Sequence, residues 1–229
     1  MCRLLLLRSA EPTDAAPWVR SFSERCRASD EYQGHGWGFA SWVNGAWQHS
    51  RSIRPIWEET HELPPSRLTL VHARSAFRNE GIVVENNMPF VDGGLAFAFN
   101  GEIRGVKLAA PGATGAAKLM SLFTRFRDVG GGDSGAALDR LNTVVTRRSE
   151  HVRALNVMVS DGRSVWTNSH FAADEAAYFT LHEARMPDVA GGLTVVSSER
   201  LDVPDFSPAW TPLPNHSLVT HSEESPCLS

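Results

Sequence analysis

The second residue of the chain is a cysteine, and its place could give it two chemical functions at once. If Met1 is removed after synthesis, Cys2 becomes the N-terminal residue and carries both a thiol and a free α-amine. An α-amino group titrates at about pH 7.7–8.0, so at cellular pH it can accept the proton of the thiol. The thiolate is the nucleophilic form of cysteine, and an adjacent base increases its population. The alternative is that position 2 carries a cysteine by accident.

The other cysteines give Cys2 no structural partner. The chain has three cysteines, Cys2, Cys26 and Cys227, which are odd in number and far apart. This pattern is typical of reduced thiols rather than of a disulfide framework, and we therefore expect a cytoplasmic protein. The histidines are dispersed, and no Cys/His cluster has the spacing of zinc ligands. The sequence predicts neither a metal nor another cofactor.

Composition excludes several classes of partner. The 229 residues are 42% hydrophobic and 21% charged, which is typical of a soluble globular protein. A formal net charge of −4 gives no support for binding to nucleic acid or to an anionic membrane. The apolar run Leu4 to Leu7 is too short to cross a bilayer, and Arg8 ends it, so it is also a poor secretory signal.

The elements that must position Cys2 can be read from the apolar patterns. A buried strand is expected at residues 2–8, directly after the cysteine, and a short helix at residues 16–29. The dipeptide Asn44-Gly45 between two apolar runs predicts a β-hairpin. Further strands are expected at residues 68–73 and 94–99, the second of which ends at Asn100-Gly101.

The second half of the chain reads as two helices followed by strands. The helices are expected at residues 115–127 and 136–148, and a second hairpin is expected around Asp161-Gly162. The remaining strands are expected at residues 177–182 and 193–197. Strands, two helices and strands again predict two sheets with helices packed on them, in a single domain over residues 2–215. A flexible tail is expected at residues 216–229.

Four segments, in this order, resemble the class II glutamine amidotransferases, whose nucleophile is an N-terminal residue. The resemblance covers nearly the whole chain and implies an α+β fold, a four-layer αββα sandwich, with no cofactor. Any one of the segments is a weak signal, but the ordered set is specific. The segments are Met1-Cys2-Arg3-Leu4, Gly36-Trp37-Gly38-Phe39-Ala40, Val71-His72-Ala73-Arg74-Ser75-Ala76 and Phe97-Ala98-Phe99-Asn100-Gly101-Glu102-Ile103.

The resemblance implies a role for individual residues of these segments. Cys2 would attack an amide carbonyl and form a thioester, with its own α-amine as the base. The Asn100 side-chain amide and the Gly101 backbone N–H would stabilise the oxyanion. Arg74 would bind the substrate's α-carboxylate, a task that suits the planar guanidinium group. Substrate-binding positions would also include the neighbours in these motifs and the position of the amine-recognising acid, namely Ser75, Trp37, Gly38 and Gly115.

Each of these residues alone also has an ordinary structural explanation. Asn100-Gly101 alone is most often a hairpin turn, Arg74 alone a surface or ion-paired arginine, and Trp37 alone a core residue. Gly38 would allow the backbone to come close beside the nucleophile. The combination with Cys2 is what favours the catalytic interpretation.

The sequence departs from the family where the acyl group should bind. Phe77 replaces a usual threonine, and Met88 replaces a usual histidine. In the best alignment Gly115 replaces the aspartate that receives the α-ammonium of glutamine. Loss of one partner of a buried charged contact costs about 2–5 kcal/mol, so a free ammonium would bind poorly unless another acid serves it. The candidate acids are Asp92, Glu102 and Asp133.

These observations predict an amidohydrolase that cleaves a γ-glutamyl or related amide of a small-molecule intermediate. Its acyl donor would present a carboxylate to Arg74 and need not carry a free amine. One alternative is a glutaminase subunit that supplies ammonia to a separate synthase or pathway enzyme. Another is a pseudoenzyme that keeps the fold for partner binding. The oligomeric state stays open.

Overall fold

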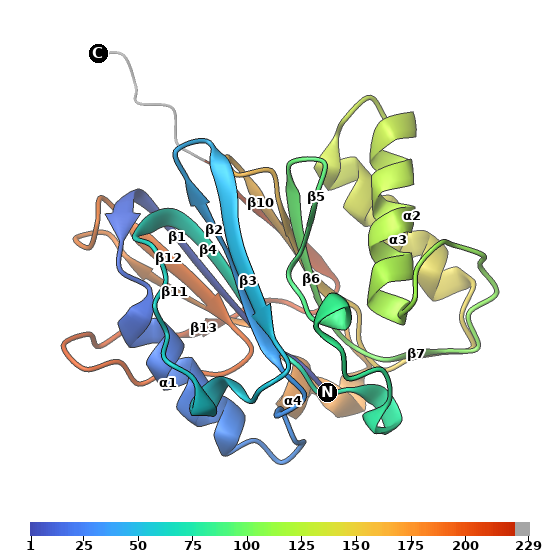
Figure 1. Cartoon of the computed structure of the whole chain (residues 1–229). Helices are drawn as coiled ribbons and strands as arrows, with labels where there is room; N and C mark the ends of the chain where they lie inside the picture. The colour runs from blue at the N-terminus through green and yellow to red at the C-terminus, as the bar shows by residue number, and fades with distance from the viewer. Residues whose placement is uncertain (223–229) are drawn as a thin grey trace.

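Two antiparallel sheets form the centre of the computed structural model, which describes residues 1–222 (Figure 1). The strands of the larger sheet, in spatial order, are β13 (Thr211–Pro212), β11 (His182–Met186), β12 (Leu193–Ser197), β1 (Arg3–Thr13), β4 (Ser66–Ala73), β2 (Trp37–Val43) and β3 (Ala46–Ser52). Those of the smaller sheet are β14 (Ser217–His221), β10 (Val165–Ser169), β9 (Asn156–Ser160), β6 (Leu95–Asn100) and β5 (Phe90–Asp92). A short separate pair joins β7 (Ile103–Arg104) to β8 (His151–Val152).

Helices cover the outer faces of the two sheets. Helix α1 (Ala16–Arg27) packs on the larger sheet, whereas α2 (Gly115–Val129) and α3 (Ser134–Arg147) lie side by side on the smaller one (Figure 1). The short α4 (Ala176–Phe179) lies near the N-terminus, at one end of the sheets. The order of layers is helix, sheet, sheet, helices, which confirms the αββα sandwich. No helix of the described part of the chain has the length and apolar character that a membrane span requires.

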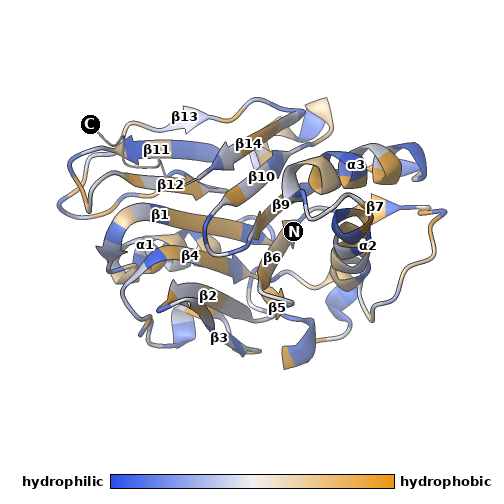
Figure 2. Ribbon diagram, turned by 90° about the horizontal axis from the view of Figure 1, so that it is seen from above, coloured by the Kyte–Doolittle hydropathy of each residue, from blue (hydrophilic) through white to orange (hydrophobic). Residues whose placement is uncertain are grey.

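Strand β1 shows why the leucine run was continuous rather than alternating. Leu4 and Leu6 belong to the hydrophobic cluster between the sheets, and Leu5 and Leu7 to the cluster under α1. A central strand with a packed layer on both faces needs apolar residues at every position. Figure 2 shows β1 and β6 as mainly hydrophobic and β11, farther toward the edge of its sheet, as mainly hydrophilic. By the same two-residue period, Cys2 is directed to the side of Leu4 and Leu6, between the sheets.

The predicted hairpin at Asn44-Gly45 is confirmed. Strands β2 and β3 pair from Val43 and Ala46 outward, and the two turn residues have φ values of 51° and 80°. Positive φ at both central positions is the requirement of a type I′ turn, which Asn-Gly satisfies best. The second hairpin, between β9 and β10, is also confirmed. The predicted strand at 193–197 is β12, and the three predicted helices correspond to α1, α2 and α3.

Two expectations about the end of the chain are wrong. Residues 177–182 do not form a strand, because α4 ends at Phe179 and β11 begins only at His182. The short helix buries Phe179 completely. A short apolar run of this kind does not distinguish a helical turn from a strand. The tail does not start at residue 216, because Ser217–His221 is strand β14, paired with β10 along its length. The remainder of the expected tail, 223–229, lies outside the described residues.

A buried histidine between the sheets makes stability depend on pH. His72 on β4 is fully buried, and neither ring nitrogen makes a well-formed hydrogen bond to any described residue. Burial, reinforced by the charge of Arg74 and only partly offset by the backbone of Phe99, lowers the pKa of His72 to about 3. The folded state therefore keeps this imidazole neutral at pH values where the unfolded chain, with an ordinary histidine pKa of about 6.5, takes up a proton.

The consequence is a loss of stability as the pH falls below about 6.5. From 1.36 kcal/mol per pKa unit, His72 alone should lower the free energy of unfolding by about 2 kcal/mol between pH 7.5 and pH 5. Urea unfolding of a His72→Leu variant should show a pH dependence weaker by that amount. His49→Leu, at an exposed position, should keep the parental dependence. Parallel pH profiles for His72→Leu and the parent would contradict the assignment.

Candidate active site

A single cleft brings most of the predicted site residues together. It has a volume of about 740 Å³ and lies where the start of β1 and the ends of β4 and β6 meet the first turn of α2. Five of the predicted site residues line it, namely Cys2, Arg74, Ser75, Gly101 and Gly115. These residues come from four parts of the chain.

The thiol of Cys2 faces the backbone of Ser75. The Ser75 N–H donates to Sγ at 3.5 Å, and Sγ lies 3.7 Å from the Ser75 carbonyl oxygen. Ser75 thus contacts the nucleophile through its backbone. Burial raises the pKa of the Cys2 thiol; the Ser75 N–H, the N-terminal ammonium and Arg74 oppose this effect but do not cancel it. The thiol is therefore protonated at neutral pH, and a nucleophilic reaction at Sγ would require a base next to it.

Arg74 offers a cation to the cleft. Its residue is 7% exposed, and its guanidinium donates to Asn87 Oδ1 at 3.0 Å and to the Glu80 carbonyl oxygen at 3.4 Å. Within residues 1–222 no carboxylate forms an ion pair with it, in contrast to Arg3, whose Nη2 lies 2.5 Å from Glu199. The neutral contacts fix the guanidinium plane and leave its charge available for an anionic ligand.

Asn100 and Gly101 are buried at the end of β6, and Gly101 lines the cleft. Asn100 is fully buried at the end of β6, and neither its amide nitrogen nor its amide oxygen has a hydrogen-bond partner among the described residues. An unmade buried hydrogen bond costs about 1–3 kcal/mol, which a substrate contact would recover. At Gly101 a Cβ atom would lie 1.9 Å from the Ala154 carbonyl oxygen, so only glycine fits this close approach.

Neither Gly38 nor Trp37 lines the cleft. A Cβ at Gly38 would lie 2.6 Å from the Met88 carbonyl oxygen, so β2 packs tightly on the segment that carries Met88 into the cleft lining. Trp37 points to the opposite face of β2, in the cluster under α1. Its Nε1 donates to Glu59 Oε2 at 2.6 Å. The structure therefore places Trp37 in the core and not in the cleft lining.

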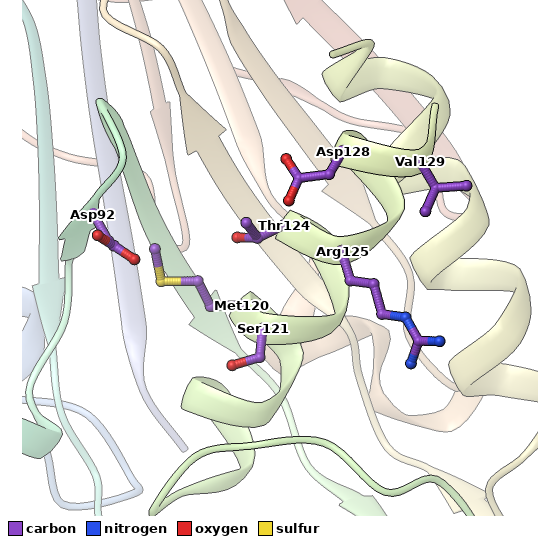
Figure 3. A pocket seen from close by; sticks show the side chains of 7 residues that line it. All are labelled: Asp92, Met120, Ser121, Thr124, Arg125, Asp128 and Val129. Carbon is purple, nitrogen blue, oxygen red and sulfur yellow. The ribbon is translucent and has the colours of Figure 1, made fainter. Parts of the chain in front are cut away.

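No acid occupies the position that the alignment gives to ammonium recognition. Gly115 is the first residue of α2, directly after Thr114, whose hydroxyl accepts from the Ala117 N–H at 3.2 Å. No atom lies within 4 Å of a Cβ built on Gly115, so the space there is open. Two of the candidate replacement acids are elsewhere. Asp92 lines a separate hollow between β5 and α2 (Figure 3), and Asp133 caps α3.

The third candidate, Glu102, lines the cleft but is already neutralised. It belongs to a network at the N-terminus in which Arg153 donates to Glu31 at 2.7 Å and to Glu175 at 2.6 Å, and lies 3.9 Å from Glu102. The network holds three carboxylates, two guanidinium groups and one ammonium, those of Glu31, Glu102, Glu175, Arg104, Arg153 and the Met1 N-terminus. The formal charges balance. Glu80 also lines the cleft, but it is exposed, and solvent weakens a charged contact there.

Three residues that contact Met1 were not predicted from the sequence. Glu31 forms an ion pair with the Met1 ammonium. The Met1 carbonyl oxygen accepts hydrogen bonds from Gln33 Nε2 and, at 2.7 Å, from the Tyr178 hydroxyl. Glu31 and Gln33 follow α1, and Tyr178 is on α4, nearly 150 residues later in the chain. No local motif marks such a set, and only the fold brings it together.

Comparison with known proteins identifies the fold. No protein-family model and no curated protein sequence matches the chain. Among solved structures, glutamine phosphoribosylpyrophosphate (PRPP) amidotransferase from B. subtilis superimposes with a TM-score of 0.70 at 14% identity, over 97% of this chain and 48% of that one. A glutamine aminotransferase class-II domain protein from Silicibacter pomeroyi gives 0.60 at 19% identity, over 97% and 96% of the chains. A predicted glutamine amidotransferase from Pseudomonas aeruginosa gives 0.59 at 18%, over 96% and 97%.

The two sheets between helical layers have the fold of the N-terminal-nucleophile hydrolases. More particularly, it is the form of that fold found in class II glutamine amidotransferases. The chain spans about half the length of the B. subtilis enzyme and almost the full length of the two smaller proteins.

Proposed function

We propose that the protein is an amidohydrolase of the class II glutamine amidotransferase type, with Cys2 as an N-terminal nucleophile. The observation that carries this proposal is the meeting of a buried thiol and an arginine side chain on one cleft, those of Cys2 and Arg74. Arg74 has no carboxylate partner among residues 1–222. Asn100 lies directly before Gly101, which lines the cleft, and its buried amide has no hydrogen-bond partner within the same residues. A scaffold without activity has no use for this combination.

The mechanism requires that Met1 be removed. The α-amine of Cys2 then takes the thiol proton, and Sγ attacks the carbonyl carbon of the amide. The oxygen of the tetrahedral intermediate is held by the Asn100 side chain and the Gly101 N–H. The nitrogen of the substrate amide takes the proton from the α-amine of Cys2 and leaves as a free amine. A thioester remains on Sγ. Water, activated by the same amine, hydrolyses the thioester to a carboxylic acid and restores the thiol.

The preferred acyl donor, in this proposal, carries a carboxylate for Arg74 and no free ammonium group. The open space at Gly115 supplies no acid, and the carboxylate of Glu102 already forms an ion pair with Arg104. The cleft lining includes apolar side chains such as those of Ile103, Val106, Leu108 and Leu119. An unpaired ammonium bound against them would lose hydration without gaining a partner. A γ-glutamyl-like amide without the free amine fits better than glutamine.

A matched pair of substrates tests this proposal. Glutaramate is glutamine without its α-amine, and both release ammonia on hydrolysis. We expect glutaramate to be hydrolysed with a kcat/KM at least equal to that of glutamine. An acid partner for the ammonium would instead favour glutamine by about 2–5 kcal/mol, which is roughly 30-fold to several thousand-fold. That outcome would support the second candidate, a glutaminase that supplies ammonia to another protein.

The same open space allows the converse experiment. In Gly115→Asp a carboxylate enters free space at the first position of α2, where the helix N-terminus also favours a negative charge. The ratio of kcat/KM for glutamine to that for glutaramate should rise about tenfold or more, corresponding to at least about 1.4 kcal/mol. An unchanged ratio would show that position 115 does not face the α-carbon of the acyl group. Glu24→Gln, on the exposed side of α1, serves as a control.

A further inference from the structure

We propose that the space occupied by Met1 becomes the binding site for the leaving amine of the substrate, and that this amine carries a second, cationic group. The inference rests on the proposed function, because it concerns the molecule from which Met1 has been removed. It specifies the half of the substrate that the acyl pocket does not contact. The residues that form this leaving-amine site are Glu31, Gln33 and Tyr178.

The first step of the argument is covalent geometry. The Met1 carbonyl carbon is bonded to the nitrogen that becomes the α-amine of mature Cys2. In the proposed reaction this same amine must return a proton to the leaving nitrogen, which requires a separation of about 2.6–3.2 Å. The leaving nitrogen therefore lies next to the position of the Met1 carbonyl, and its substituent extends into the space that Met1 occupied.

The second step is that this space is a prepared binding site. Met1 is held at three points: its ammonium by Glu31, its carbonyl oxygen by Gln33 and Tyr178, and its side chain by the cluster of Ala154, Phe171 and Phe179. Only Met1 is removed, so all the groups that bind it remain in the processed protein. After its removal they present a carboxylate, two hydrogen-bonding groups and an apolar wall beside the nucleophile.

The site is also held rigid from behind. Arg153 binds the other oxygen of Glu31 at 2.7 Å. The Arg3 guanidinium carbon lies 3.7 Å above the centre of the Tyr178 ring, and its Nη1 donates to the Tyr178 carbonyl oxygen at 2.9 Å. Arg3 is buried and is the next residue after the nucleophile. The leaving-amine site and Cys2 are therefore fixed relative to each other, as an active site requires.

The third step concerns charge. With Met1 in place, the network of Arg153 contains equal numbers of positive and negative groups. Removal of Met1 takes one ammonium away from Glu31, and the α-amine of Cys2 is neutral when it acts as a base. The network then has one excess negative charge at the leaving-amine site. Because the site is partly buried, a cationic substituent would compensate this charge more strongly than water alone.

The class of amine follows from these contacts. In Met1 the ammonium nitrogen is two bonds from the carbonyl carbon, so the second cation of the leaving amine should lie within a few bonds of the scissile nitrogen. Short diamines meet this requirement. Hydrolysis releases such an amine and the free carboxylic acid, with water as the only co-reactant.

Two isosteric amides test the inference. N-(2-aminoethyl)glutaramate and N-propylglutaramate differ only in the ammonium or methyl group that would lie near Glu31. We expect kcat/KM to be at least tenfold higher for the aminoethyl amide. In Glu31→Gln this ratio should fall to about one, because the kcat/KM for the aminoethyl amide should fall more than that for the propyl amide. Glu24→Gln should keep the parental ratio. As a measurement without a variant, 1,2-diaminoethane should inhibit the parent at least tenfold more strongly than propylamine.

The opposing outcomes can be separated. Equal kcat/KM for the two amides, with equal inhibition by the two amines, would overturn the leaving-amine site but not the proposed function. An equal loss of kcat/KM for both amides in Glu31→Gln would also overturn the leaving-amine site, because Glu31 would then act on the α-amine of Cys2. If neither amide is hydrolysed and Cys2 resists an acylating probe, the proposed function itself has failed, and this inference fails with it.

Discussion

Replacement of Cys2 by alanine should lower kcat for amide hydrolysis by about 10⁴-fold or more, because the proposed thioester forms on the Sγ atom of Cys2. Alanine is also small, so removal of Met1 should proceed as in the parent. The measurement is product release from glutaramate or glutamine, together with the intact mass of both proteins. The parent should lose the mass of methionine and then gain one adduct from a glutamine analogue that acylates thiols.

Cys26 provides the matched control for this experiment. It is a buried cysteine of α1, and burial raises the pKa of its thiol well above the ordinary value. Cys26→Ala should retain both the hydrolysis and the single adduct. If instead every molecule of the parent keeps Met1, or the probe modifies Cys2 no faster than Cys26, the catalytic assignment is wrong. The protein would then be a subunit that keeps the fold for binding a partner.

Replacement of Asn100 by alanine should lower kcat by about 10²–10³-fold, the usual cost of one oxyanion donor. The free energy of unfolding should change little, because both polar atoms of the side chain lack partners in the described part of the chain. A functional group that does not stabilise the fold is the expected sign of a site organised for a transition state. Kinetics and urea unfolding of one protein preparation measure both quantities.

Asn156, directly opposite Asn100 on the neighbouring strand, is the control for this prediction. It is equally buried, but its Nδ2 donates to the Phe179 carbonyl oxygen at 2.7 Å and its Oδ1 accepts from the His170 N–H at 3.0 Å. Asn156→Ala should therefore cost about 1–3 kcal/mol of stability and leave the kcat of the folded protein nearly unchanged. The reverse pattern, with a loss of stability at Asn100 and of kcat at Asn156, would exclude the oxyanion role.

Local patterns predicted the parts of the fold that local physics determines. The Asn44-Gly45 turn follows from the φ values of two residues, and β1 follows from a continuous apolar run. The errors arose where long-range packing decides. The apolar residues before His182 are compatible with a strand, but burial of Phe179 is achieved by one helical turn. The segment Ser217–His221 has little apolar character and becomes a strand because the backbone of β10 is available for pairing.

The same division holds for the candidate site. Cys2, Arg74 and Gly101 lie in recognisable motifs, and the structure brings them to one cleft. Trp37 lies in such a motif too, but strand alternation directs it to the far face of the sheet. Glu31 and Tyr178 have no motif. Their importance depends on contacts between distant loops, which a single sequence does not encode in any short pattern.

The pairing of β1 has a consequence for the timing of biosynthesis. Strand β1 lies between β4 and β12, and Leu5 pairs with Ser197 near the far end of the chain. In the folded protein the Met1 side chain is only 13% exposed, and both its ammonium and its carbonyl are bound. An aminopeptidase should therefore reach Met1 only before β1 is enclosed in the sheet. Enclosure of β1 requires β12, so Met1 stays accessible until nearly the whole chain has left the ribosome. Overexpression that saturates the aminopeptidase should yield a mixture of processed and permanently unprocessed molecules, and the active fraction should follow the rate of synthesis.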